Sequence, residues 1–226
     1  MGIRRLIRNL KKKYKPTIDH SRHKTTLIKL GDDYGGYRVD PSRINPKGTV
    51  ISIGIGGNAS FDKDLLKLFP EIKVIAVDPT ELAKETISKL LSKYPSFRNR
   101  LTLVQKAVVG DHQKKIKLGG NASSVFGDSG DEFEAININD LLKVFRDITL
   151  LKIDIEGAEY QVLDSLEYFN FEQLLIEWHH WLEKVPYSLD DTKKYISNIE
   201  LKGFHELERT TEESWRLIQE SFFIKL

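Results

Sequence analysis

The chain has 226 residues, 40% of them hydrophobic and 30% charged, which is the composition of a globular protein with room for one α/β domain. It contains no cysteine, which excludes disulfides and thiolate metal sites and makes a reducing cytoplasm the expected location. No apolar run approaches the roughly 20 residues that a membrane helix requires, so we expect neither a membrane span nor a secretory signal.

The net charge of +2 is unevenly distributed along the chain. Residues 1–24 contain nine lysines or arginines and one aspartate, so this segment carries +8 and the rest of the chain −6. A mildly acidic body does not predict nucleic-acid binding. Apolar residues at helical spacing predict an amphipathic helix over residues 2–14. Weak association of this helix with an anionic surface is one interpretation, but its few aliphatic side chains favour packing against the domain.

Residues 25–48 are rich in glycine and proline and are expected to be irregular. Tyr34 and Tyr37 could pack over the edge of a pocket. We therefore divide the chain into residues 1–47, a basic N-terminal helix with a lead-in segment, and residues 48–226, the main domain.

A glycine-rich turn follows the first predicted strand of the main domain. The β-branched run over residues 50–55 predicts a buried parallel strand, and it breaks at Gly54, Gly56 and Gly57. Asn58 or Ser60 could cap a following helix. A strand, a glycine turn and a helix N-terminus together can hold an anionic or nucleotide-like ligand, although many tight strand-to-helix connections have the same pattern.

A second buried strand over residues 73–78 ends in Asp78, which lies 22 residues after Gly56. At this spacing a βαβ unit places an acid that accepts hydrogen bonds from ribose hydroxyls. Asp78 could instead be a turn or N-cap aspartate before Pro79. The glycine turn favours the ribose interpretation.

The middle of the chain predicts a helix over residues 81–93 and a third strand at 101–104. Residues 107–109 and 114–118 are expected to be two strands about a turn, followed by a polar loop over 119–131 and a short helix over 141–145.

A strand over residues 149–156 places Lys152, Asp154 and Glu156 on one face and closes at Gly157. A carboxylate in a buried strand costs several kcal/mol if unpaired, so Asp154 needs a ligand or a partner. Lys152 is the structural candidate for that partner. The carboxyl edge of an open α/β sheet is, however, where such folds place their chemistry.

A further strand over residues 174–180 puts Glu177 and His179 on one face, and Trp178 and His180 on the other. If this strand neighbours the one that ends at Asp154, a carboxylate and a histidine converge and supply a general base. The same group could form a hard-metal site, although two acids and one histidine do not establish one. A stacked Trp–His edge without chemistry is the alternative. A helix over 189–201 and a terminal strand pair complete the chain.

From residue 48 onward the chain resembles the FkbM-type methyltransferases, class I enzymes that use S-adenosylmethionine (SAM). The most specific similarity is Leu151-Lys-Ile-Asp-Ile-Glu-Gly-Ala-Glu159, and the glycine turn and Asp78 support it. The resemblance implies a Rossmann-like, mostly parallel seven-stranded sheet with helices on both faces and a C-terminal antiparallel hairpin. In one respect the chain departs from the family, because Ser52 stands where the family usually has an acid.

The resemblance also implies roles for particular residues. The cofactor's methionine part would lie against the turn, its ribose against Asp78, and its adenine near Lys106 and Ala107. Asp154 would lie under the sulfonium and the acceptor. The turn residues concerned are Gly54, Ile55, Gly56, Gly57 and Asn58.

We therefore predict SAM-dependent O-methylation of a hydroxyl on a sugar, glycan or natural product. The proposed base is His179, with Asp154 or Glu156 orienting it or acting instead. One alternative is a nicotinamide-dependent oxidoreductase, because Gly54–Ala59 also fits a dinucleotide fingerprint. The other is a glycan- or protein-binding module without catalysis. The sequence does not identify the acceptor, metal dependence or oligomeric state.

Overall fold

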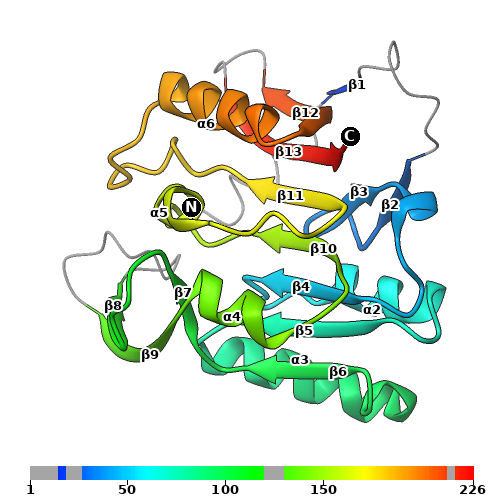
Figure 1. The fold of residues 1–226 in the computed structure, drawn as a ribbon. Coiled ribbons are helices and arrows are strands. Elements are labelled where there is room, and N and C mark those ends of the chain that lie inside the picture. The colour runs from blue at the N-terminus through cyan, green and yellow to red at the C-terminus, as the bar shows by residue number, and fades with distance from the viewer. Residues whose placement is uncertain (1–14, 19–26, 120–129, 213–216) are drawn as a thin grey trace.

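The computed structural model describes residues 15–18, 27–119, 130–212 and 217–226 (Figure 1). The predicted helix over residues 2–14 and most of the predicted loop over 119–131 lie outside these ranges. Within them, no helix combines the length and apolar character needed to cross a bilayer.

One mixed sheet organises the molecule (Figure 1). Its strands, in spatial order, are β1 (Lys15–Ile18), β12 (Phe204–Glu212), β13 (Leu217–Lys225), β11 (Gln173–Glu177), β10 (Ile148–Ile153), β4 (Thr49–Ile53), β5 (Lys73–Val77) and β6 (Leu101–Val104). The strands from β11 to β6 are parallel neighbours, whereas β13 runs antiparallel to β11 and β12. This confirms the predicted seven-stranded sheet with a C-terminal hairpin. β1 adds an eighth, antiparallel strand at the edge, where Pro16 is tolerated.

Helices cover both faces of the sheet, as predicted. On one face, α2 (Ser60–Leu68) and α3 (Glu81–Lys93) pack over a core that includes Val50 of β4. On the other, α4 (Ile138–Val144), α5 (Glu159–Ser165) and α6 (Leu189–Leu201) pack over a core that includes Ile51 and Ile53. Successive residues of β4 thus supply both cores, because side chains alternate along a strand. Two short 3₁₀ helices, η1 (Pro41–Arg43) and η2 (Pro95–Phe97), complete the helical elements of the described chain.

The lead-in segment is more regular than predicted. β2 (Ile28–Leu30) and β3 (Tyr37–Val39) form an antiparallel hairpin that packs on the same face as α2. Its loop is anchored to α2, since Gly31 N donates to Asp64 Oδ2 at 2.9 Å and Asp32 N to Ser60 Oγ at 3.1 Å. The prediction of an irregular segment was wrong here because three-residue strands are too short to show an alternating pattern. The domain boundary at residue 47 stays a prediction.

A second correction concerns the middle of the chain. β7 (Ala107–Val109) and β8 (Lys115–Leu118) are both strands, but they do not pair with each other. Between them lies β9 (Asp131–Asn137), parallel to β7 and antiparallel to β8. The sequence did not predict β9 because its first residues are charged and exposed, which hides the apolar alternation of a strand.

Candidate functional site

Four loops meet at the carboxyl edge of the sheet. They follow β4, β5, β10 and β11, which are neighbours in the parallel part of the sheet. The loop after β4 is the glycine turn, residues 54–58. The loops after β10 and β11 carry Asp154, Glu156 and His179. The parallel order therefore brings together the residues that the sequence analysis singled out.

The glycine turn depends on backbone conformations that side chains disfavour. Gly54 has φ +81° and Gly56 has φ +51°. A Cβ on Gly54 would lie 1.7 Å from the carbonyl oxygen of Asp154, whereas a Cβ on Gly56 would meet nothing within 4 Å. Gly54 is thus required for the close approach of β10, and the backbone at Gly56 faces open space that a ligand can enter.

Asp78 closes the glycine turn from the next strand. Its Oδ2 accepts from the N–H groups of Ile55 and Gly56, both at 2.9 Å. Its Oδ1 accepts from the backbone N and the hydroxyl of Thr80, at 2.9 and 2.6 Å. Asp78 therefore has the geometry of a turn aspartate. The contact of Asp78 with ribose stays a prediction. In that contact, a ribose hydroxyl would bind a carboxylate that already accepts hydrogen bonds from Ile55, Gly56 and Thr80.

The remaining cofactor candidates lie around the same turn. Asn58 donates to Asp32 of the β2–β3 loop at 3.0 Å and accepts from Ser60 N at 2.9 Å. Lys106 and Ala107 follow β6 at the carboxyl edge, with Lys106 Nζ 3.0 Å from Glu134 Oε2 and Ala107 buried. The adenine assignment of these two residues is untested.

A buried acid stands near Ser52 although the strand itself lacks one. Asp62 of α2 is buried, and burial raises its pKa, while the Lys152 charge and the Ser52 hydroxyl oppose that rise. Ser52 Oγ and Asp62 Oδ1 are both buried, and neither makes a hydrogen bond of good geometry. A buried carboxyl from the adjoining helix therefore lies close to Ser52.

Lys152 joins the glycine turn to the end of β10. Its buried ammonium donates to Gly54 O at 2.8 Å, to Ile53 O at 3.3 Å and to Asp154 Oδ2 at 3.2 Å. The predicted pairing of Asp154 with Lys152 is confirmed. Asp154 is nevertheless 24% exposed at its side chain, so the partner does not seal it from a ligand.

The carboxylate–histidine cluster lies where β10 and β11 end, and it consists of Tyr37, Asp154, Glu156, Glu177 and His179. His179 Nε2 is 3.8 Å from Asp154 Oδ1, 3.6 Å from Glu156 Oε2 and 4.0 Å from Glu177 Oε1. The Tyr37 hydroxyl lies 2.9 Å from both Asp154 Oδ2 and Glu177 Oε2. The predicted convergence of the two strand ends is confirmed.

Glu159 fixes His179 from behind. This fully buried carboxylate accepts from His179 N at 2.7 Å, lies 3.3 Å from His179 Nδ1 and accepts from Gly157 N at 2.8 Å. Nε2 is thereby directed at the cluster. As predicted, His180 takes the other side of the chain, where its Nδ1 lies 3.1 Å from Thr192 Oγ1 of α6.

Burial and neighbouring charges shift the pKa values of His179 and Glu156. Burial lowers the pKa of His179, but the carboxylates of Glu159 and Glu156 outweigh this effect and raise it to about 10. Burial raises the pKa of Glu156 to about 7, against the opposing charge of His179. Glu156 also has φ +53°, an uncommon conformation for a residue with a side chain. A histidine with such a pKa holds its proton at neutral pH, which counts against His179 as a general base.

Sequence reasoning missed three contributors to this site. It placed Tyr37 only at a pocket edge, it left Glu177 out of the catalytic group, and it gave Glu159 no role. Tyr37 and Asp154 are 117 positions apart, so no local pattern connects them. Glu177 was detectable from its shared strand face with His179, and Glu159 from its place in the first turn of α5.

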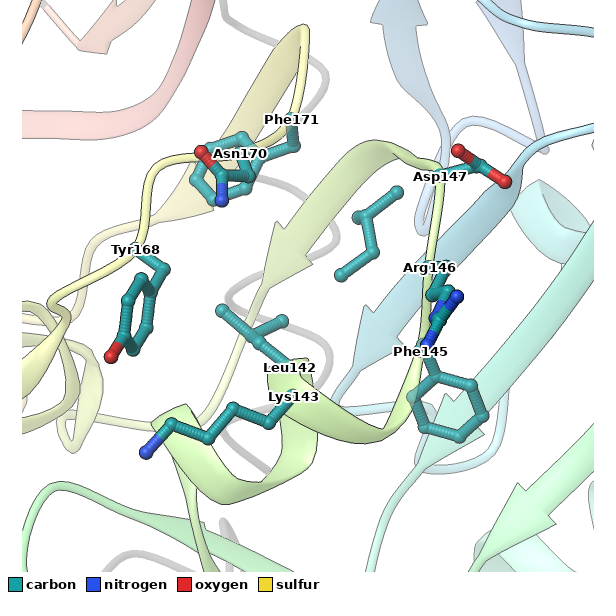
Figure 2. A pocket seen from close by; sticks show the side chains of 9 residues that line it. Leu142, Lys143, Phe145, Arg146, Asp147, Tyr168, Asn170 and Phe171 are labelled. Carbon is teal, nitrogen blue, oxygen red and sulfur yellow. The ribbon is translucent and has the colours of Figure 1, made fainter.

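The larger pocket described lies elsewhere, at the amino ends of β10 and β11 (Figure 2). It measures about 470 Å³ and is lined by residues that include Lys143, Arg146, Tyr168 and Phe171. β10 separates it from Asp154 by six residues, or about 20 Å of extended chain. It is therefore not the site of the cluster.

Comparison with known proteins gives one informative match: a family model described as the methyltransferase FkbM domain matches residues 40–206. No curated protein sequence matches the chain. Similar solved structures include a protein from Clostridium thermocellum titled a putative rRNA methylase, with 11% identity, 80% of this chain and 89% of that chain covered, and a TM-score of 0.49. TrmK from M. capricolum, in complex with S-adenosyl-homocysteine, has 10% identity, 80% and 64% coverage, and a TM-score of 0.47.

Proposed function

Because the chain belongs to the FkbM family of SAM-dependent methyltransferases, we propose that it methylates a hydroxyl oxygen of a small acceptor, a sugar, glycan or natural product. Family membership removes the nicotinamide alternative. The observation that carries the proposal is the position of Asp154, whose carbonyl packs against Gly54 while its Oδ1 faces His179. One residue thus borders both the glycine turn and the carboxylate–histidine cluster.

The glycine turn has the features that the cofactor requires. Its backbone faces open space at Gly56, and a Cβ on Gly57 would come no nearer than 3.6 Å to a neighbouring atom. Residues 54–58, Asp78, Lys106 and Ala107 would hold SAM, which supplies a methyl group already activated on its sulfonium. The chain then has to align the acceptor oxygen in line with that methyl group and to exclude water.

The acceptor side of Asp154 suits a compound rich in hydroxyl groups. Asp154, Glu156 and Glu177 are carboxylates, which accept hydrogen bonds when ionised, and hydroxyl groups donate them. Asp154 and Glu156 have side-chain exposures of 24% and 37%, whereas His179 is 3% exposed. An acceptor can therefore reach the two carboxylates more readily than the histidine.

This geometry revises the choice of base. We propose that Asp154 or Glu156 takes the proton of the acceptor hydroxyl, and that His179 stabilises their negative charge. The low exposure of His179 and its raised pKa both support this order. Glu156 lies 3.6 Å from His179 Nε2, close enough for its charge to be stabilised.

The test uses SAM that carries an isotopically labelled methyl group. The purified chain is incubated with a panel of sugars and polyols and with fractionated cell extract, and products are searched by mass spectrometry for one labelled methyl group. We expect label on an oxygen, with loss of turnover in Asp154→Asn and normal turnover in the exposed control Asp140→Asn. Label found only on nitrogen, or none on any compound while SAM binds in a calorimetric titration, would overturn the proposal.

A further inference from the structure

We propose that Asp154, Glu177 and His179 form a binding site for a divalent cation of the Mn²⁺ or Mg²⁺ type. The three side chains each offer one ligand atom, and these atoms all lie within 4.8 Å of one another. Asp154 Oδ1 and Glu177 Oε1 are 3.8 and 4.0 Å from His179 Nε2. Two carboxylate oxygens and one imidazole nitrogen therefore face a common point.

The spacing of these atoms fits a site that contracts slightly on binding. With metal–ligand distances of about 2.1 Å, neighbouring ligand atoms are about 3.0 Å apart in octahedral and about 3.4 Å apart in tetrahedral coordination. The two separations from His179 Nε2, 3.8 and 4.0 Å, exceed the octahedral value by about 1 Å, and the two carboxylate oxygens lie within 4.8 Å of each other. Carboxylate rotation can supply that movement without a change in the backbone.

The second observation in favour of a site concerns the side-chain atoms of the three ligands that would not bind the metal. The protein already contacts each of these atoms. The Tyr37 hydroxyl lies 2.9 Å from Asp154 Oδ2 and from Glu177 Oε2, which are the oxygens that point away from His179. Glu159 Oε1 lies 3.3 Å from His179 Nδ1 and so leaves Nε2 as the free coordinating atom. Ligands oriented by outer hydrogen bonds in this way are characteristic of metal sites.

The orientation of the His179 ring also favours a site. The side chain is 3% exposed, and its Nε2 points into the cluster at 3.6 to 4.0 Å from three carboxylate oxygens. These separations are longer than hydrogen bonds but are bridged readily by a cation.

The local charge is also favourable. Asp154, Glu156, Glu159 and Glu177 surround His179 with four carboxylates, and Lys152 supplies one positive charge. Lys152 does not occupy the proposed position, because it contacts Asp154 Oδ2 and two carbonyl oxygens on the side of the glycine turn. A divalent cation between Oδ1, Oε1 and Nε2 would add positive charge at the point where these carboxylates converge.

The donor set indicates the type of ion. Oxygen-rich sets suit Mg²⁺, Ca²⁺ and Mn²⁺, and an imidazole nitrogen shifts the preference toward Mn²⁺ and other transition metals. Resting on the proposed methylation of a hydroxyl, the role of the ion would be to bind the acceptor oxygen and lower its pKa. Glu156, which is not among the proposed ligands, would then take the proton. Cation binding itself can be measured without any acceptor.

The test is titration of the metal-stripped, full-length chain with Mn²⁺, followed by the electron paramagnetic resonance signal of free Mn²⁺. We expect one site per chain, and at least about a tenfold weaker affinity in Glu177→Gln. The matched control is Glu172→Gln, an exposed acid just before the same strand, which should bind as the wild type does. Mn²⁺ should also raise the melting temperature of the wild type and of the control more than that of Glu177→Gln.

A second measurement on the unaltered chain covers the case in which the variant misfolds. Pulsed resonance of bound Mn²⁺ should detect a directly coordinated nitrogen that shifts when histidine is labelled with ¹⁵N. No binding at millimolar Mn²⁺, no nitrogen coupling, or full affinity in Glu177→Gln would each overturn the inference. Labelled methyl transfer at full rate in the presence of a chelator would overturn it too, yet would leave the proposed function standing.

Discussion

The glycine turn and the carboxylate–histidine cluster lie at the same edge of the sheet but are built in opposite ways. The turn is held by backbone groups, with its N–H donors paired to Asp78. The cluster is held by side chains, and three of its carboxylates lie within 4.0 Å of His179 Nε2. The hydrogen bonds of a backbone site can be complete before its ligand binds. A site of concentrated charge, in contrast, is stabilised most when a ligand of opposite charge binds.

Replacement of the turn glycines should have the largest effect. Gly54→Ala would place a Cβ 1.7 Å from Asp154 O, so β4 and β10 must separate. We expect a loss of at least about 3 kcal/mol in the free energy of unfolding and a fall of roughly 6 to 12 °C in melting temperature. SAM affinity should fall with it.

Gly56→Ala is the matched control for this change. It meets no atom within 4 Å but keeps φ +51°, so we expect a cost of only about 1 to 2 kcal/mol. Thermal melts of Gly54→Ala and Gly56→Ala, measured side by side, distinguish the effect of backbone conformation from that of the close approach of β10. Equal losses would mean that backbone conformation, and not the approach of β10, makes Gly54 necessary.

The same contrast explains how far the sequence could be interpreted. The turn and Asp78 are local patterns, and the strands that precede them were predicted to within two residues. The bounds of α3 and α6 were predicted to the residue. The parallel order followed from the buried runs, and the convergence of Asp154 with His179 followed from that order. These parts depend on periodicity and spacing, which a single sequence displays.

The cluster could be predicted only in part because its members come from distant segments. Tyr37 reaches Asp154 and Glu177 from a hairpin whose three-residue strands leave no periodic signal. The raised pKa of His179 depends on Glu159, which the chain brings behind the ring only after folding. Which residue takes a proton is thus a property of packing, and the choice of His179 as base could not be checked from the sequence.

Asp78→Asn should have the next largest effect, because it tests whether the turn depends on one carboxylate. Asparagine keeps one acceptor oxygen but turns an NH₂ group toward N–H donors that now bond to Oδ1 or Oδ2. We expect a loss of about 2 kcal/mol and roughly 4 to 8 °C in melting temperature. Calorimetric titration with SAM should show weaker binding, and Asp140→Asn should change neither quantity.

Tyr37→Phe tests the cluster alone. The ring keeps its edge contact with Phe61 at 5.4 Å and its contact with Lys152 at 5.0 Å, while the hydroxyl that bridges the two carboxylates is lost. We expect Mn²⁺ affinity to fall about tenfold with SAM affinity unchanged, because Tyr37 positions ligands and does not border Gly56. A parallel fall in SAM affinity would show that the turn and the cluster are not independent.

The smallest expected effect concerns Asp62, the buried acid on α2 near Ser52 and the glycine turn. Burial raises the pKa of this carboxyl above its usual value of 3.8, so the folded state binds the proton more tightly than the unfolded state. The stability that this preference contributes is full below pH 3.8 and is lost as the pH rises through the folded-state pKa.

Asp62→Asn does not titrate, so its stability relative to the wild type should increase from acid to neutral pH. Denaturant titrations at several pH values measure this difference, with Asp191→Asn as the control. The capping hydrogen bonds with Ser188 lower the pKa of Asp191 to about 2, so that variant should differ from the wild type by a constant amount above about pH 5. A constant difference for Asp62→Asn as well would mean that burial does not raise the pKa of Asp62.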